Sequence, residues 1–162
     1  MQNDVIRETT EMVRTLRSKN DPEQLAAALR KLAELRRHEG DEAKALDNYE
    51  EAVSLYRKSG NALRLAHTIR HLGDIHRRAG RFDKALACYE EALRICRRSK
   101  DVSTLDLANT VRALAVLSSD TGKNSKAEKL WKKARSLYEQ AGVGAGAEEC
   151  DKRLDALRKQ HS

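Results

Sequence analysis

Proline and aromatic residues are scarce in this 162-residue sequence, which contains one Pro, one Phe, one Trp and four Tyr. This scarcity excludes a collagen-like chain and is untypical of a β-sandwich, and 40% hydrophobic residues argue against a disordered tail. Long apolar runs are missing too, since stretches such as Leu25 to Leu29 are only five residues long. A membrane-spanning helix needs about 20 apolar residues, so we expect none.

Cysteine is also rare, with three residues, and two of them lie on one predicted helix. Cys88 and Cys96 are eight positions apart, which is too far along a helix axis for a disulfide. The first residues carry acids and no apolar stretch, so they do not predict a signal peptide. We therefore expect a protein of the reducing cytoplasm.

An internal repeat organises the sequence. Gly40, Gly80 and Gly122 are 40 and 42 residues apart, and the residues around them recur in the same register. Before each glycine come a Leu and a small residue; after it come an Ala, an aromatic residue and another Ala. Small residues let two helices approach closely while the ring fills the space between them. These positions are Leu32, Ala33, Gly40, Ala45, Tyr49 and Ala52, then Leu72, Gly73, Gly80, Ala85, Tyr89 and Ala92, then Leu114, Ala115, Gly122, Ala127, Trp131 and Ala134.

Apolar residues on both sides of each glycine follow helical spacing, which predicts two helices joined by a turn. Glycine suits the left-handed conformation that ends a helix. Asp21 and Pro22 are typical of a helix start, and Asn61 and Ser103 occupy the equivalent capping positions of the later repeats. The sequence therefore predicts an all-α chain with three helix-turn-helix units.

The six-position motif, present three times, resembles that of the tetratricopeptide repeat family. The repeats are longer than the family's usual 34 residues and resemble the kinesin-light-chain type, whose lead-in is similar to Leu65-Ala66-His67-Thr68 and Leu107-Ala108-Asn109-Thr110. The resemblance implies a right-handed α-α superhelix, here of about eight antiparallel helices. It also implies a scaffold or adaptor for protein-protein interaction.

We expect residues 1–162 to form one domain of this kind. The three repeats are predicted at residues 25–61, 65–100 and 107–141. Residues 4–19 align with the second helix of a repeat and are expected to cap the N-terminal end. Residues 147–160 carry an apolar stripe among charges, which is typical of a capping helix at the end of a repeat stack.

The resemblance also implies that the first helix of each repeat lines a concave peptide-binding groove. Seven of the positions assigned to this groove are Arg or Lys and three are Asp or Glu, so much of the formal charge of +7 is expected there. The positions are Ala27, Arg30, Lys31, Glu34, Arg37 and His38 in the first repeat, His67, Arg70, His71, Asp74, Arg77 and Arg78 in the second, and Asn109, Arg112, Ala113, Val116, Ser119 and Asp120 in the third.

Arg30, Arg70 and Arg112 occupy the same position of consecutive repeats and are expected to form a ladder. Guanidinium groups bind carboxylates through two parallel hydrogen bonds, so the predicted ligand is an acidic peptide, an acidic helix or a C-terminal carboxylate. Asn109 is expected to bond the ligand backbone. The alternative is that the arginines pair with Glu34 and neighbouring acids and only solvate the surface.

His67, His71 and Asp74 fall on one helical face at a spacing that suits zinc. The nearby arginines would repel a cation, so we expect no metal, and no other cofactor. Protonation of the two histidines near neutral pH is instead expected to strengthen the binding of acidic ligands.

No catalytic motif such as HExxH, GxSxG or a P-loop is present, and we expect no enzymatic activity. Residues 142–146 are glycine-rich, but they join two predicted helices and are expected to be a flexible linker. Nucleic-acid binding through basic pairs such as Arg97-Arg98 is an alternative function, although rings for base stacking are few. A second alternative is a homodimer formed through residues 4–19. We expect an acidic protein or peptide partner and no membrane association.

Overall fold

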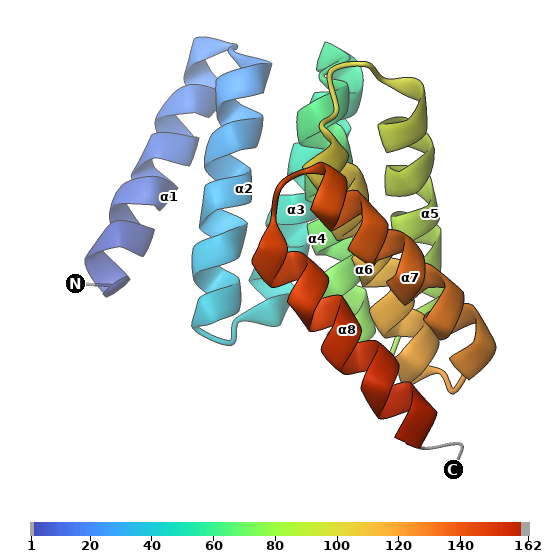
Figure 1. Cartoon of the computed structure of the whole chain (residues 1–162). Coiled ribbons are helices and arrows are strands. Elements are labelled where there is room, and N and C mark those ends of the chain that lie inside the picture. Colours follow the sequence, from blue (N-terminus) through green and yellow to red (C-terminus); the bar gives the residue numbers. More distant parts are fainter. Residues whose placement is uncertain (1, 160–162) are drawn as a thin grey trace.

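A computed structural model describes residues 2–159, in which eight α-helices and no strand are found (Figure 1). The predicted all-α solenoid is confirmed. The helices are α1 (Gln2–Lys19), α2 (Pro22–His38), α3 (Glu42–Ser59), α4 (Ala62–Arg78), α5 (Phe82–Arg98), α6 (Thr104–Asp120), α7 (Asn124–Gln140) and α8 (Gly144–Lys159). No helix in this part of the chain has the length and apolarity needed to cross a bilayer.

Side-chain caps start four of the helices as local sequence predicts. Asp21, Asp41, Asn61 and Ser103 each accept a hydrogen bond from the backbone N–H three residues later, at 3.0–3.2 Å. The turns inside the three repeats contain glycines with φ of +82°, +71° and +68°, in the left-handed region that side chains disfavour. Short polar caps and these glycines therefore fix where each helix begins and ends.

Packing runs along the chain, because nearly all contacts between elements join helices that are adjacent in sequence. Among the extensive contacts the exception is that between α4 and α6, the first helices of the second and third repeats. Tyr49, Tyr89 and Trp131, the rings of the repeat motif, are at most 1% exposed. Each ring is thus part of the core between helices, which leaves it no free face.

The first helix, α1, resembles the second helix of a repeat in its end and in its ion pair. Asn20 has φ of +53° at the position that Gly60 occupies after α3 with φ of +74°. An ion pair links Arg17 of α1 to Glu51 of α3 at 2.6 Å, and the same pair recurs between α3 and α5.

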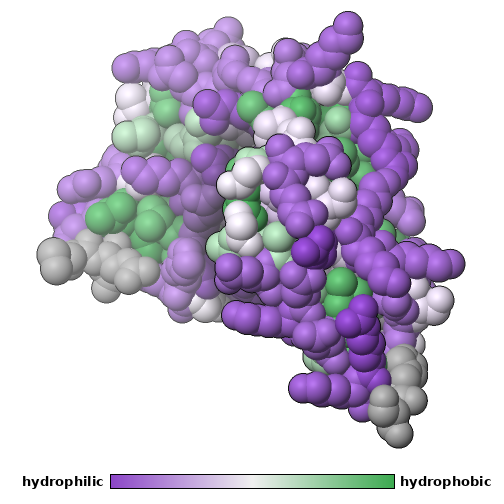
Figure 2. All heavy atoms as spheres, in the orientation of Figure 1, coloured by the Kyte–Doolittle hydropathy of each residue, from purple (hydrophilic) through white to green (hydrophobic). Residues whose placement is uncertain are grey.

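The free side of α1 carries apolar side chains. Val5 and Met12 are 38% and 51% exposed, whereas Ala45 and Ala52, at the same positions of α3, are fully buried. Figure 2 shows a mostly hydrophilic surface with several apolar areas, one of which lies over α1.

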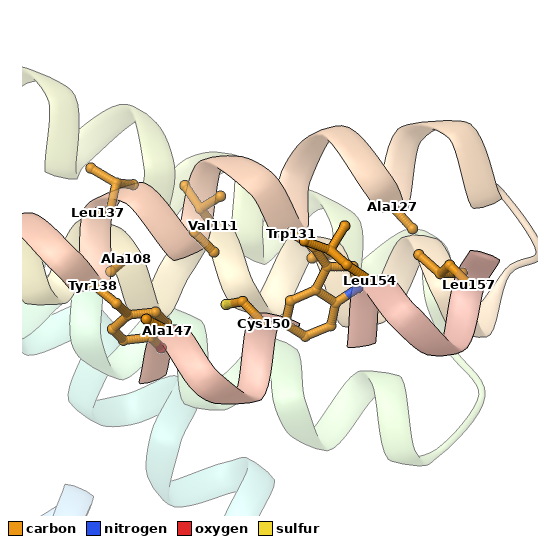
Figure 3. Packing of buried hydrophobic residues seen from close by; sticks show 12 residues of the cluster. Ala108, Val111, Ala127, Trp131, Leu137, Tyr138, Ala147, Cys150, Leu154 and Leu157 are labelled. Atoms are coloured by element: carbon orange, nitrogen blue, oxygen red, sulfur yellow. The ribbon is translucent and has the colours of Figure 1, made fainter. Parts of the chain in front are cut away.

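The last helix begins earlier than its apolar stripe suggests. Gly144 and Gly146, placed in a flexible linker by the sequence pattern, belong to α8, because Val143 accepts hydrogen bonds from the N–H groups of Gly146 and Ala147. Residue 160, the last residue of the predicted cap, lies outside the described residues. Figure 3 shows Cys150 and Leu154 of α8 beside the ring of Trp131. This packing covers the C-terminal end of the solenoid.

Candidate functional site

One side of the solenoid is lined by the first helices of the repeats, α2, α4 and α6. A cavity of about 350 Å³ opens on this side and draws residues from all three helices. Its lining consists of Arg30, Asn61, Leu63, Arg64, His67 and Asp106. Because these residues come from three repeats, the cavity is a feature of the assembled stack. We call this side the concave groove.

Two of the three predicted ladder arginines bind acids on their own helix. Arg30 donates to Glu34, and Arg70 Nη1 lies 3.9 Å from an Asp74 oxygen. Glu34 and Asp74 occupy equivalent positions four residues after the arginine, where helical side chains meet. The contacts therefore agree with the alternative in which these arginines pair within the chain.

The third arginine finds its partner on another helix. Val116 stands four residues after Arg112 and offers no acid. Glu149 of α8 instead accepts hydrogen bonds from Arg112 Nε and Nη2, both at 2.8 Å. The bond to Arg112 lowers the pKa of Glu149, and the same bond raises the pKa of Arg112. A carboxylate of the chain thus occupies the guanidinium in the two-bond geometry expected for a ligand.

The other predicted groove cations differ in environment. Arg77 Nη1 donates to Asp120 of α6 at 2.7 Å and so links two repeats. Arg37 is half-buried, and its Nε has no hydrogen-bond partner. Lys31 and Arg64 are exposed side chains without an ion pair among the described residues. Unpaired positive charge in the groove is therefore smaller than the sequence indicates.

Asn109 lies on α6, where its Oδ1 accepts a hydrogen bond from the hydroxyl of Tyr138 at 2.7 Å. Its predicted role toward a ligand backbone would have to use the amide nitrogen. Tyr138 belongs to α7, so this bond also fixes the second helix of the repeat against the first.

A polar cluster around Asp74 joins α4 to α5. The Tyr89 hydroxyl donates to Asp74 Oδ1 at 2.7 Å, and His71 Nδ1 lies 3.4 Å from Asp74 Oδ2. Burial of Asp74 opposes its ionisation, but His71 and Tyr89 outweigh burial and lower the pKa of the carboxyl. Burial together with Asp74 raises the pKa of Tyr89. The cluster is therefore an ionised carboxylate that accepts a hydrogen bond from Tyr89 and lies beside His71 and Arg70.

The two groove histidines are in direct contact, edge to face, with ring centroids 4.6 Å apart. Burial, then the neighbouring His71 and Arg70, lower the pKa of His67 from 6.5 to about 4. The expectation that protonation near neutral pH tunes the groove is thus wrong for His67. No group of three or more His, Cys, Asp or Glu side chains in the described part of the chain is arranged to hold a metal ion.

Several lining residues were missed by the sequence pattern. Leu63 and Arg64 belong to the first turn of α4, before the lead-in used to assign the groove, and Asp106 belongs to the first turn of α6. The sequence does contain a signal for this region, because a leucine recurs at the same position of neighbouring repeats, Leu63 and Leu105. In the structure both leucines are 38% exposed. Glu149 has no such signal, since its contact depends on how α8 crosses α6.

The sequence matches the Tetratricopeptide repeat family over residues 24–98 and 64–140. Residues 3–39 also match the family of Anaphase-promoting complex subunit 5. No curated protein sequence matches the chain.

Solved structures with the same fold have low sequence identity to this chain. The structure of BtubC (BKLC) from P. vanneervenii superposes with a TM-score of 0.71 at 21% identity, covering 96% of this chain and 74% of that one. A putative kinesin light chain of Podosopora anserina with nearly identical TPR-like repeats superposes with a TM-score of 0.72 at 15% identity, covering 99% of this chain and 89% of that one. A Rap protein complexed with Competence and Sporulation Factor superposes with a TM-score of 0.63 at 16% identity, covering 98% of this chain and 48% of that one. At these identities the likeness shows the fold alone.

Proposed function

The chain belongs to the tetratricopeptide repeat family, and from that premise we propose that it is a protein-interaction scaffold whose concave groove binds an acidic peptide segment. The observation that supports this proposal is the cavity of about 350 Å³ to which α2, α4 and α6 all contribute. A groove formed by three repeats suits an extended or helical peptide, because such ligands contact several repeats at once. A catalytic role has no comparable support.

The lining gives the ligand two requirements. Arg30, Arg64 and the neutral His67 offer hydrogen-bond donors, and only Asp106 is acidic. Leu63 adds an exposed apolar side chain at the rim. The ligand proposed is therefore a peptide with carboxylates and at least one apolar side chain, and its carboxylates compete with Glu34 for Arg30.

The alternative of nucleic-acid binding finds little support in the rings, because Tyr49, Tyr56, Tyr89 and Trp131 are at most 1% exposed and Phe82, at 37%, is a single exposed ring among the described residues. Base stacking on single strands needs free aromatic faces. Proteins of similar fold include a Rap protein in complex with Competence and Sporulation Factor, which is consistent with a partner held by a helical stack.

An array of ten-residue peptides rich in Asp and Glu, each with a free and an amidated C-terminus, tests the proposal. Arg64→Glu should lower the affinity for the captured peptides by about tenfold, because the substitution replaces an attraction with a repulsion at the groove rim. Lys152→Glu, at an exposed lysine of α8 that does not line the cavity, is the control with the same change in net charge. Equal binding by the wild type and Arg64→Glu would contradict the groove assignment.

A further inference from the structure

The outer face of the solenoid, formed by α1, α3, α5 and α7, carries a repeated ion pair. Arg17 of α1 pairs with Glu51 of α3 at 2.6 Å, and Arg57 of α3 pairs with Glu91 of α5 at 2.7 Å. The two pairs are separated by 40 residues, the length of one repeat, so they are the same contact made twice. Each pair bridges two outer helices.

The same ion pair is missing between α5 and α7, because the position of its acid carries a lysine. The equivalents of Arg57 and Glu91 one repeat later are Arg97 of α5 and Lys133 of α7. Both are exposed, and neither has an ion pair in the part of the chain that the structure describes. Two cations cannot bridge the outer helices as an arginine and a glutamate do.

More lysines continue along the same side of α7. Lys126, Lys129 and Lys133 recur at intervals of three and four residues, so they form one stripe on the helix. At the positions of Lys129 and Lys133, α3 has Asp47 and Glu51. At the position of Lys133 both earlier repeats have an acid, Glu51 and Glu91, whereas Lys126 falls where they also have lysine. The stripe is thus unpaired positive charge that includes the one position where an acid has been replaced in the series.

Apolar side chains lie at the bottom of the surface between α5 and α7, which we call the furrow. Leu86 and Leu93 of α5 and Leu130 of α7 are partly buried against Leu114 and Leu117 of α6. At one end of this furrow is a small cavity of about 50 Å³, whose lining combines the apolar Phe82, Leu86 and Leu117 with the charged Asp83, Lys123 and Lys126. Phe82 is 37% exposed. An apolar floor with a lysine rim fits an apolar side chain followed by carboxylates.

We propose that the furrow between α5 and α7 is a second binding surface, for a peptide that places an apolar side chain beside Phe82 and carboxylates on Lys126, Lys133 and Arg97. The partner supplies the acid that the series of ion pairs lacks at this step. The leucines between α5 and α7 and the exposed ring of Phe82 favour a peptide over nucleic acid, whose backbone offers only phosphates and sugars to such a surface. This surface is distinct from the concave groove.

Fluorescein-labelled twelve-residue peptides, each with four Glu and one Leu at varied spacing, are the probe, with Gln-for-Glu and Ser-for-Leu versions as matched peptides. Binding is measured in the Arg64→Glu variant, which removes the proposed groove site. We expect Lys133→Glu to weaken binding by roughly fivefold and Lys126→Glu/Lys133→Glu to weaken it further. Lys152→Glu should leave it unchanged, and both matched peptides should bind more weakly than the probe.

The same substitution has an opposite effect on stability, which separates lost binding from unfolding. Lys133→Glu places a carboxylate opposite Arg97 and restores the repeated ion pair, so the Tm should rise by about 1–3 °C. Unchanged peptide binding by Lys133→Glu would overturn the proposal, as would binding that ignores the Leu. Lys133-dependent binding of single-stranded DNA or phosphatidylserine vesicles, without binding of the acidic peptides, would overturn it as well.

Discussion

Arg112 and Glu149 form a two-bond ion pair that joins the third repeat to the last helix, with Nε and Nη2 each 2.8 Å from a carboxylate oxygen. In the first two repeats the groove arginine binds an acid on its own helix; here Val116 stands at that position. This ion pair therefore links α8 to α6 and occupies the hydrogen-bond donors of the third groove arginine.

Replacing Glu149→Gln should release Arg112 for an external carboxylate. If the groove binds acidic peptides, we expect affinity to rise about threefold to tenfold, because the ligand no longer competes with an internal carboxylate. Stability measured in urea should fall by about 0.5–1 kcal/mol, the range for a partly exposed ion pair. The charge swap Arg112→Glu/Glu149→Arg should recover the stability but not the affinity. A loss of affinity in Glu149→Gln would contradict this competition.

Two buried tyrosines at the same repeat position should respond differently to removal of the hydroxyl. The Tyr89 hydroxyl donates to Asp74, whereas the Tyr49 hydroxyl is buried without a partner. Tyr89→Phe should cost about 1.5–3 kcal/mol, the range for a hydrogen bond to a charged group, while Tyr49→Phe should be neutral or stabilising. Urea denaturation of both variants measures this difference, and equal costs would be inconsistent with it.

The same bond has a pH signature. The pKa of Asp74 is lowered in the fold, so its contribution to stability is present above the unfolded value of 3.8 and is lost as the pH falls through the folded pKa. Tyr89→Phe removes one donor and should raise that pKa. Acid unfolding should therefore begin at a higher pH than in the wild type.

Two glycines inside helices are required by neighbouring rings. A Cβ at Gly73 would lie 2.6 Å from Tyr89 Cε1, and one at Gly146 would lie 2.5 Å from Tyr138 Cδ1, whereas at Gly144 no atom lies within 4 Å. Gly73→Ala and Gly146→Ala should cost about 1–3 kcal/mol despite the better helix propensity of alanine. Gly144→Ala, the control at the start of α8, should be neutral or slightly stabilising. Thermal melts compare the three, and a stabilised Gly73→Ala would contradict the close packing.

His67 should make folding pH-dependent in the acidic range. Its pKa is about 4 in the fold and 6.5 ordinarily, so between these values the unfolded chain binds a proton that the folded chain does not. Stability should therefore fall as the pH drops from 6.5 toward 4. His67→Gln should flatten this slope by up to about 1 kcal/mol per pH unit. Equal slopes in the variant and the wild type would contradict the burial of His67.

The repeat positions were predictable because each depends on contacts within one helical hairpin. Leu72, Gly80 and Tyr89 occur at fixed spacings, which predict helical hairpins joined by turns; the superhelix is what the resemblance to the tetratricopeptide repeat family implies. Charge partners were not predictable in the same way. Arg112 resembles Arg30 and Arg70 in the sequence, yet its partner lies 37 residues away on a helix outside the repeat register.

The cavity shows the same limit. Asn61 was recognised as a helix cap, and it does cap α4, but it also lines the groove beside Arg30 of the preceding repeat. Such lining depends on how consecutive repeats are rotated against each other. Spacing within one repeat carries no information about that rotation.

The stacking of each helix on its neighbours in the chain has a mechanical consequence. No long loop has to close before contacts form, so folding can start within any hairpin and spread to either side. A force that pulls the termini apart would break the contacts between neighbouring helices one after another instead of straining all of them at once. The chain should lengthen in steps, beginning at α1, which contacts only α2 extensively. Such a stack can act as a soft molecular spring between the partners attached to it.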